Sequence, residues 1–122
     1  MVTLDYRDAR PIYTQIYDGL REQILTGILQ PGDKLPSVRE LAATLTINPN
    51  TIQRSYTLLE ADGWISSVPG KGSFVSGIPN SISTEQHQLW QELDKLTAHL
   101  THLGISQEQI IRHIREGGND HA

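Results

Sequence analysis

The sequence predicts a mainly α-helical protein with one small β-hairpin, followed by a helical C-terminal segment. Three observations carry this prediction. Apolar residues recur at helical spacing in several separate segments. Two short runs of strand-forming residues, ISSV and SFVS, flank the turn sequence PGKG. After a linker that contains glycine and proline, leucines repeat in alternating steps of four and three residues.

The first predicted helix begins at Pro11 and ends near Gly27. Proline suits the first helical position because its missing N–H would have no partner there. One apolar stripe repeats every four residues, at Ile12, Ile16, Leu20 and Ile24. Gly27 is a suitable C-terminal stop, and the Pro31-Gly32 pair predicts a turn beyond it.

Two further helices are predicted in close succession. In SVRELAATL, residues 37–45, Ser37 can cap the helix and Glu40 stands three residues later, which is the spacing of a capping box. A short break then leads to Asn48, a cap residue, followed by Pro49 at the first helical position. This pair predicts the start of a third helix over residues 48–62, with Gly63 as its stop.

The hairpin is predicted over residues 65–76, with Lys71 between two glycines at its tip. Helix, short helix, tight break, helix and hairpin are the elements of a winged helix-turn-helix in their chain order. We therefore predict this fold for residues 1–76. Residues 77–122 are predicted to contain a linker, GIPNSIS, and two helices that form a dimerisation segment.

A leucine seam in the C-terminal segment predicts self-association. Its members are Leu89, Leu93, Leu96, Leu100 and Leu103. We predict a homodimer through this seam, because so long an apolar stripe exceeds what the chain's own winged domain offers as a partner. Packing against that domain or against the last helix is the alternative.

The last helix is predicted to begin after Ser106, because Gln109 completes a second capping box. Its apolar residues include Ile110 and Ile114, and Trp90 is expected to pack beneath them. The tail GGNDHA is expected to be loose.

Composition limits the classes of function. The net charge is −4, from 10 Lys and Arg against 14 Asp and Glu, and residues 1–80 hold seven basic and eight acidic side chains. The basic footprint of a nucleic-acid binder is absent at the level of the whole chain, so such a role requires a local arrangement. No stretch has the length and apolarity of a signal peptide or a membrane span, which predicts a soluble, cytoplasmic protein without a membrane partner.

We predict no enzymatic activity, no cofactor and no metal. The chain has no cysteine, which excludes disulfides, thiolate metal sites and Cys nucleophiles, and it has no Ser–His–Asp arrangement with supporting context. His99 and His102 share a helix face, but a zinc site needs three or four ligands and no carboxylate stands at matching spacing. Two helices also leave little volume for a small-molecule effector, which is left unassigned.

The outer face of the third helix is polar but carries little charge. At 100° per residue its inner positions are Ile52, Tyr56 and Leu59. The opposite stripe consists of Asn50, Gln53, Arg54 and Thr57. Asn and Gln pair with adenine edges, Arg with guanine, and Thr with either a base or a phosphate. A solvated helix without a partner is the alternative for this stripe taken alone.

Three further features favour DNA binding. The start of the third helix is expected to offer free N–H groups to a phosphate. Arg39 lies on the short helix that crosses the DNA backbone in helix-turn-helix docking, although a salt bridge to an acid such as Glu60 is the alternative. Lys71 stands where glycines let the backbone approach a groove, although a lysine at a flexible tip can also serve solubility alone.

The segment from Pro11 to Val75 resembles the DNA-binding domain of the GntR family of bacterial transcription regulators. The motifs that carry the resemblance are PGDKLPS-x-RELA, the NPNT helix start, L-x-x-x-GW and GKGSFV. The short two-helix tail is similar to that of the YtrA subfamily. Many members carry a basic residue where this chain has Pro49, so the contact made by that residue is not available here.

The resemblance implies a homodimeric repressor that binds a palindromic operator in double-stranded DNA. Residues 48–62 would be the recognition helix in the major groove, and residues 65–76 the wing on the adjacent groove. The family's DNA contacts map onto Ser37, Arg39, Asn48, Asn50, Thr51, Gln53, Arg54, Lys71 and Gly72. The competing prediction is a winged-helix interaction module, in which the same polar stripe binds a partner protein.

Overall fold

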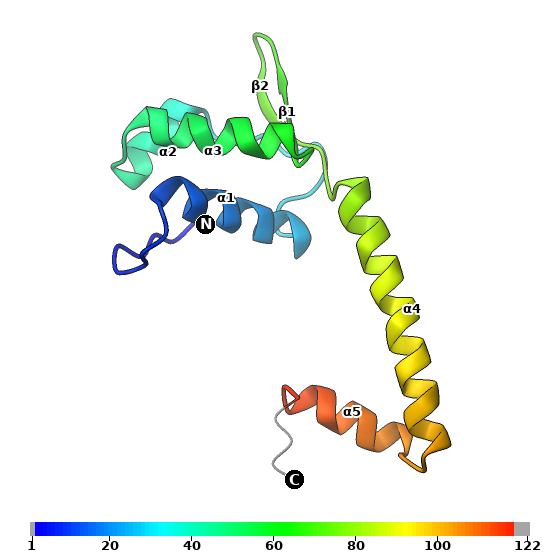
Figure 1. The fold of residues 1–122 in the computed structure, drawn as a ribbon. Coiled ribbons are helices and arrows are strands. Elements are labelled where there is room, and N and C mark those ends of the chain that lie inside the picture. The colour runs from blue at the N-terminus through cyan, green and yellow to red at the C-terminus, as the bar shows by residue number, and fades with distance from the viewer. Residues whose placement is uncertain (1, 119–122) are drawn as a thin grey trace. The chain divides into compact units, whose positions relative to one another are not determined.

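The structure, a computed structural model, describes residues 2–118. Its elements are α1 (Ile12–Leu25), α2 (Val38–Leu45), α3 (Pro49–Ala61), β1 (Ile65–Val68), β2 (Gly72–Val75), α4 (Asn80–His102) and α5 (Gln107–Arg115) (Figure 1). Contacts divide the chain into two units, Met1–Asn80 and Ser81–Ala122. The mainly α-helical fold with one antiparallel hairpin is the predicted one. The last four residues of the GGNDHA tail lie outside the described residues.

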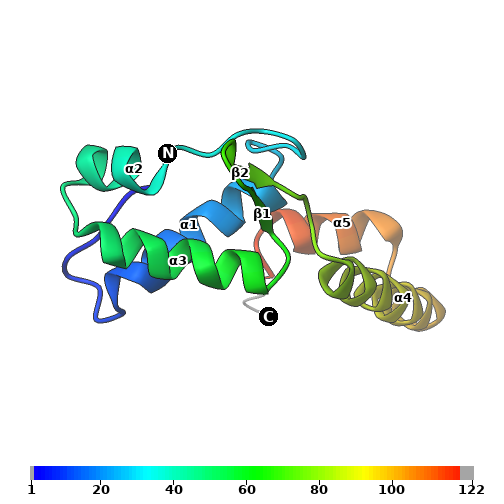
Figure 2. The same cartoon turned by 90° about the horizontal axis from the view of Figure 1, so that it is seen from above.

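The core of the first unit forms where α1 and α3 run side by side and α2 packs against α3 (Figures 1 and 2). Ile16, Ile52 and Leu59 are completely buried. The remaining apolar core residues are Val2, Leu20, Ile24, Leu35, Leu41, Ala42, Tyr56, Trp64, Ile65 and Val75. The predicted inner face of α3 is therefore confirmed, and its polar stripe is left at the surface.

Local hydrogen bonds explain where these helices begin. Asn48 caps α3 by accepting a bond from the Asn50 N–H at 2.9 Å, and Pro49 is the first helical residue, as predicted. Pro11 was expected inside α1, but its extended ψ of 149° makes it the cap, with its carbonyl accepting from Thr14 and Gln15.

The capping box expected at α2 is only half formed. The Ser37 hydroxyl accepts from the Glu40 N–H at 3.1 Å. In the described part of the chain, no bond returns from the Ser37 N–H to the Glu40 side chain.

The hairpin pairs β1 with β2, with Ile65 opposite Val75 and Val68 opposite Gly72. Its tip is closed by a bond of 2.9 Å from the Lys71 N–H to the Val68 carbonyl. Pro69 and Gly70, the latter with a φ of 75°, occupy the central positions, which is the chemistry of a type II turn.

A third segment, residues 33–35, lies along the outer edge of β2 and was not predicted. The Leu35 N–H donates to the Ser73 carbonyl at 2.9 Å, and the Val75 N–H donates to the Asp33 carbonyl at 2.8 Å. The paired stretch is too short to show strand periodicity, and Pro36 follows it directly. The connection between α1 and α2 is thereby attached to the wing.

The second unit contains most of α4, together with α5. α4 begins at Asn80, so the linker is shorter than the predicted GIPNSIS, and Leu103 lies just beyond the end of the helix. The capping box at α5 is confirmed, with the Gln109 N–H donating to the Ser106 hydroxyl at 3.1 Å and the Ser106 N–H donating to Gln109 Oε1 at 2.8 Å.

The expected packing of Trp90 beneath the last helix is wrong, because its side chain is 64% exposed. α5 instead lies near the C-terminal part of α4, where Ile110 and Ile111 share a depression with Thr97, Ala98 and Thr101. That contact is about two helical turns beyond Trp90. Among the described residues, no helix is long and apolar enough to cross a membrane.

Candidate nucleic-acid interface

The polar stripe of α3 is exposed in full, at Asn50, Gln53, Arg54 and Thr57. Two of its members are joined to each other, since Gln53 Nε2 donates to Thr57 Oγ1 at 3.2 Å. This bond uses one of the two amide hydrogens of Gln53 and leaves its Oε1 free. Gln53 therefore keeps the donor and the acceptor that an adenine edge requires.

Arg54 differs from the rest of the stripe in where its side chain lies. Its guanidinium carbon is 3.7 Å from the centroid of the Tyr13 ring in α1. A helical wheel could not show this contact, because Tyr13 belongs to a different helix. Arg54 therefore occupies the edge of the stripe that faces α1.

The start of α3 does not offer the free N–H groups that the sequence led us to expect. Pro49 has no N–H, the Asn50 N–H is bonded to the Asn48 side chain, and the Thr51 N–H donates to the Asn48 carbonyl at 3.0 Å. The bonds that cap the helix therefore occupy the backbone N–H groups that a phosphate would otherwise bind. Asn48 keeps its exposed side-chain NH2 as a donor, whereas Thr51 is half-buried.

Arg39 is exposed on the first turn of α2, two residues after the cap Ser37. It makes no ion pair within residues 2–118, so the alternative of a salt bridge is not realised there. Glu60, one suggested partner, binds Ser67 instead. Arg39 borders a shallow depression at the corner between α2 and α3, which is lined by Ala42, Ala43, Thr46, Ile47 and Pro49.

The wing carries two lysines, of which the sequence indicated only one. Lys71 is exposed at the turn, as predicted. A Cβ atom at Gly72 would lie 3.0 Å from Lys34 Cε, so the Lys34 side chain crosses the wing directly over this glycine. Gly72 also has a φ of 120°, which disfavours other residues. Lys34 was missed because only the pairing of residues 33–35 with β2 brings it to the wing.

The charges of the first unit divide into two groups. Arg7, Arg10 and Arg21 each lie within 4 Å of an aspartate, and Arg10 is 2.8 Å from Asp8. The side-chain hydrogen bond with Arg10 holds the pKa of Asp8 below its usual value. Among the described residues of this unit, the cations without an ion pair are Lys34, Arg39, Arg54 and Lys71. These four cations lie on α2, α3, the wing and the segment attached to it.

Two tyrosines fix α3 within this arrangement. The Tyr56 hydroxyl donates to the Pro36 carbonyl at 2.7 Å, and burial, with a contribution from the charge of Glu40, raises the pKa of Tyr56 to about 12. At the C-terminal cap of α3, Asp62 accepts a hydrogen bond from the Tyr17 hydroxyl of α1. Burial and this hydrogen bond raise the pKa of Tyr17.

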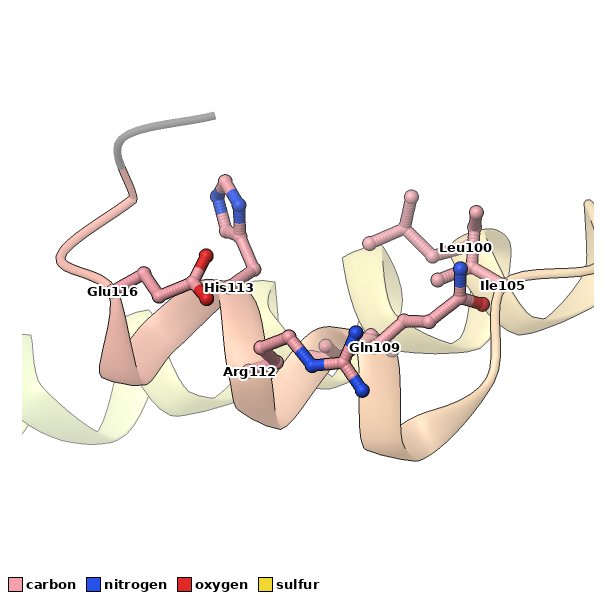
Figure 3. A pocket seen from close by; sticks show the side chains of 7 residues that line it. Leu100, Ile105, Gln109, Arg112, His113 and Glu116 are labelled. Atoms are coloured by element: carbon pink, nitrogen blue, oxygen red, sulfur yellow. The ribbon is translucent and has the colours of Figure 1, made fainter. Parts of the chain in front are cut away.

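In the C-terminal unit, no described side chain of α4 or α5 is buried. Leu96 is 61% exposed and Leu103 is 67% exposed. Figure 3 shows an open pocket where the end of α4 meets α5. It is lined by Leu100, Ile105, Gln109, Ile110, Arg112, His113 and Glu116. Large apolar side chains of α4 and α5 are thus left uncovered in the single chain.

A helix-turn-helix with an attached wing, a polar outer helix face and unpaired cations on these elements defines a DNA-binding transcription regulator. A family model described as "Bacterial regulatory proteins, gntR family" matches residues 12–75. The chain belongs to the gntR family.

Individual relatives extend the similarity over most of the chain. The chain is 36% identical over 118 residues to the HTH-type transcriptional repressor YtrA of Bacillus subtilis (strain 168). The matched region covers 95% of this chain and 91% of that protein. A solved GntR family transcriptional regulator from Listeria monocytogenes is 37% identical, with a TM-score of 0.61 over 93% of this chain and 98% of its own. The DNA-binding domain of AraR, solved in complex with operator ORR3, is 28% identical with a TM-score of 0.54, over 61% of this chain and 89% of its own.

Proposed function

We propose that the protein is a cytoplasmic, homodimeric repressor that binds a palindromic operator and has no catalytic role. Residues 48–62 enter the major groove, and the wing at residues 65–76 lies on the adjacent groove. One observation carries the proposal. Among its described residues, the first unit pairs its N-terminal arginines with aspartates and leaves four cations unpaired, all of them on α2, α3 and the wing or its attached segment.

The proposed contacts fall into two classes. Base edges are read by Asn50, Gln53, Arg54 and Thr57, whose amide, guanidinium and hydroxyl groups discriminate between bases. The sugar–phosphate backbone is held by Ser37, Arg39, Asn48, Thr51, Lys71 and Gly72, and by Lys34 in addition. Phosphate contacts give affinity for any sequence, which explains why most of the charge lies outside the α3 stripe.

The homodimer is proposed from the uncovered surface of the C-terminal unit. Its exposed large apolar side chains are Leu89, Trp90, Leu93, Leu96, Leu100, Leu103, Ile111 and Ile114. Exposed apolar surface of this extent marks an interaction site. A helix without buried side chains also lacks the packing that stabilises helices in water. A second copy covers the same surface on both partners, and its two-fold symmetry predicts an operator with two inverted half-sites.

Selection from a library of random DNA duplexes tests the proposal, because it requires no operator to be chosen beforehand. The protein should enrich a palindromic motif over several rounds. The matched variant Asn50→Ala/Gln53→Ala should retain binding to unselected DNA and lose this enrichment. Failure of the wild-type protein to enrich any motif would contradict sequence-specific binding and favour the interaction-module alternative. Sedimentation velocity on the same sample tests the dimer.

A further inference from the structure

The Arg54 guanidinium lies 3.7 Å from the centroid of the Tyr13 ring, and Tyr13 belongs to α1, outside the helix-turn-helix. We propose that Tyr13 is a positioning residue for DNA readout, whose ring holds Arg54 ready to bind. This inference rests on the proposed DNA-binding function and adds to it a specificity-determining residue from another helix.

The short separation defines how the two groups meet. A guanidinium that stood on edge over the ring would bring a nitrogen too close to the ring carbons, so a carbon-to-centroid distance of 3.7 Å requires the two flat faces to stack. The five N–H donors of arginine point outward in the guanidinium plane. Stacking on the face therefore restrains the side chain and leaves those donors available to DNA.

The backbone of Tyr13 is itself held by the helix that carries Arg54. Ser55, the next residue, is completely buried and donates its hydroxyl to the Tyr13 carbonyl at 2.8 Å. The same hydroxyl lies 3.2 Å from the Thr51 carbonyl. Because the bond from Ser55 to its carbonyl fixes the Tyr13 backbone against α3, the ring is attached at a fixed point beside a long and otherwise mobile side chain.

The chemical nature of the group that restrains Arg54 also matters, because a carboxylate would hold the arginine and neutralise its charge at the same time. Arg21 shows that arrangement, since it is 3.8 Å from Asp18 and its guanidinium is 6.0 Å from the Tyr17 centroid. Arg54 has no ion pair in the described part of the chain. An aromatic face attracts the cation through its quadrupole and leaves the net charge in place. Arg54 is thereby ordered before DNA binds, and no carboxylate competes with a phosphate or a guanine for its guanidinium.

A double-mutant cycle on the selected operator tests the inference. Tyr13→Leu removes the aromatic face and keeps an apolar side chain, and Tyr13→Phe, the matched control, keeps the ring. Tyr13→Leu should weaken binding about two- to five-fold, the range of an exposed cation–π contact. The loss should fall on the same operator base pairs as the loss caused by Arg54→Ala. Tyr13→Phe should bind as the wild type does, and Tyr13→Leu/Arg54→Ala should match Arg54→Ala alone.

Two results would overturn the inference. One is an effect of Tyr13→Leu that persists in the Arg54→Ala background, and the other is tighter binding, which would mean that the ring withholds Arg54 from DNA. NMR of the free wild-type protein gives a test that needs no variant. The Arg54 Cδ protons should be shifted upfield by the ring, and ordinary shifts would contradict the stack. Wild-type protein that enriches no DNA motif would refute the proposed function itself.

Discussion

The Glu60 carboxylate accepts two hydrogen bonds from Ser67, one from its backbone N–H at 3.1 Å and one from its hydroxyl at 3.2 Å. Glu60 lies in the last turn of α3, and Ser67 lies in β1. The pair therefore joins the proposed recognition helix to the wing, next to the buried side chains of Trp64 and Ile65. The direction of the wing depends on this polar contact as well as on the core.

We predict that Glu60→Ala weakens operator binding about two- to ten-fold relative to Glu60→Gln, the value of one hydrogen bond. Both variants remove the same negative charge, but glutamine keeps an oxygen that can accept from the Ser67 N–H. Fluorescence anisotropy with the selected operator measures the difference. Equal affinities would show that the contact does not orient the wing for DNA.

Ser55→Ala should lower the free energy of unfolding by about 0.5–1.5 kcal/mol, because it removes the buried hydrogen bond that joins α3 to the Tyr13 carbonyl. Urea denaturation of the free protein measures this change. Thr44→Ala is the matched control, since the Thr44 hydroxyl makes only an exposed bond to the Glu40 carbonyl of its own helix. An equal effect of the two substitutions would contradict the role assigned to the α1–α3 bond.

Lys34→Ala should weaken binding to the operator and to unrelated duplexes by the same factor, because a lysine that contacts phosphate carries no sequence information. The slope of log K against log salt concentration should fall in magnitude by about one, as for Lys71→Ala. Lys95→Ala, in α4, should leave the slope unchanged. A Lys34 variant that alters base preference would contradict the backbone role.

Leu96→Glu should convert the dimer to a monomer, because it places a charge in the centre of the proposed apolar interface. Gln91→Glu adds the same charge on the opposite side of α4 and should leave the dimer intact. Sedimentation velocity distinguishes the two, and circular dichroism checks that the first unit stays folded. A dimeric Leu96→Glu protein would place the interface elsewhere.

Stability should fall as pH rises above 10. The pKa of Tyr56 is raised to about 12 in the folded protein, so the unfolded chain loses this proton first, at its ordinary pKa of 10. The folded protein therefore holds the Tyr56 proton more tightly than the unfolded chain does. The resulting contribution to the free energy of unfolding is present below pH 10 and is lost between pH 10 and about 12. The raised pKa of Tyr17 acts in the same direction. Urea denaturation at several pH values should show a smaller decline for Tyr56→Phe than for the wild type.

Much of the first unit could be predicted because its signals are local. Asn48 and Pro49 set the start of α3, Gly63 follows its end, and the Pro69-Gly70 pair forms the turn of the wing. The polar stripe followed from helical periodicity alone. Two of the predictions that failed, at the start of α3 and at Trp90, depended on which groups were already bonded and on where the next helix would lie.

The sequence by itself determined the positions of the helices, of the hairpin and of the polar face of α3, because caps, turns and periodicity act over a few residues. Only the tertiary structure decided that Lys34 crosses Gly72, that Arg54 stacks on Tyr13 and that Ser55 binds the Tyr13 carbonyl. Each of these contacts joins residues that are far apart in the chain. They exist because packing of the core brings α1, α3 and the wing together, and no local pattern records which surface groups then meet.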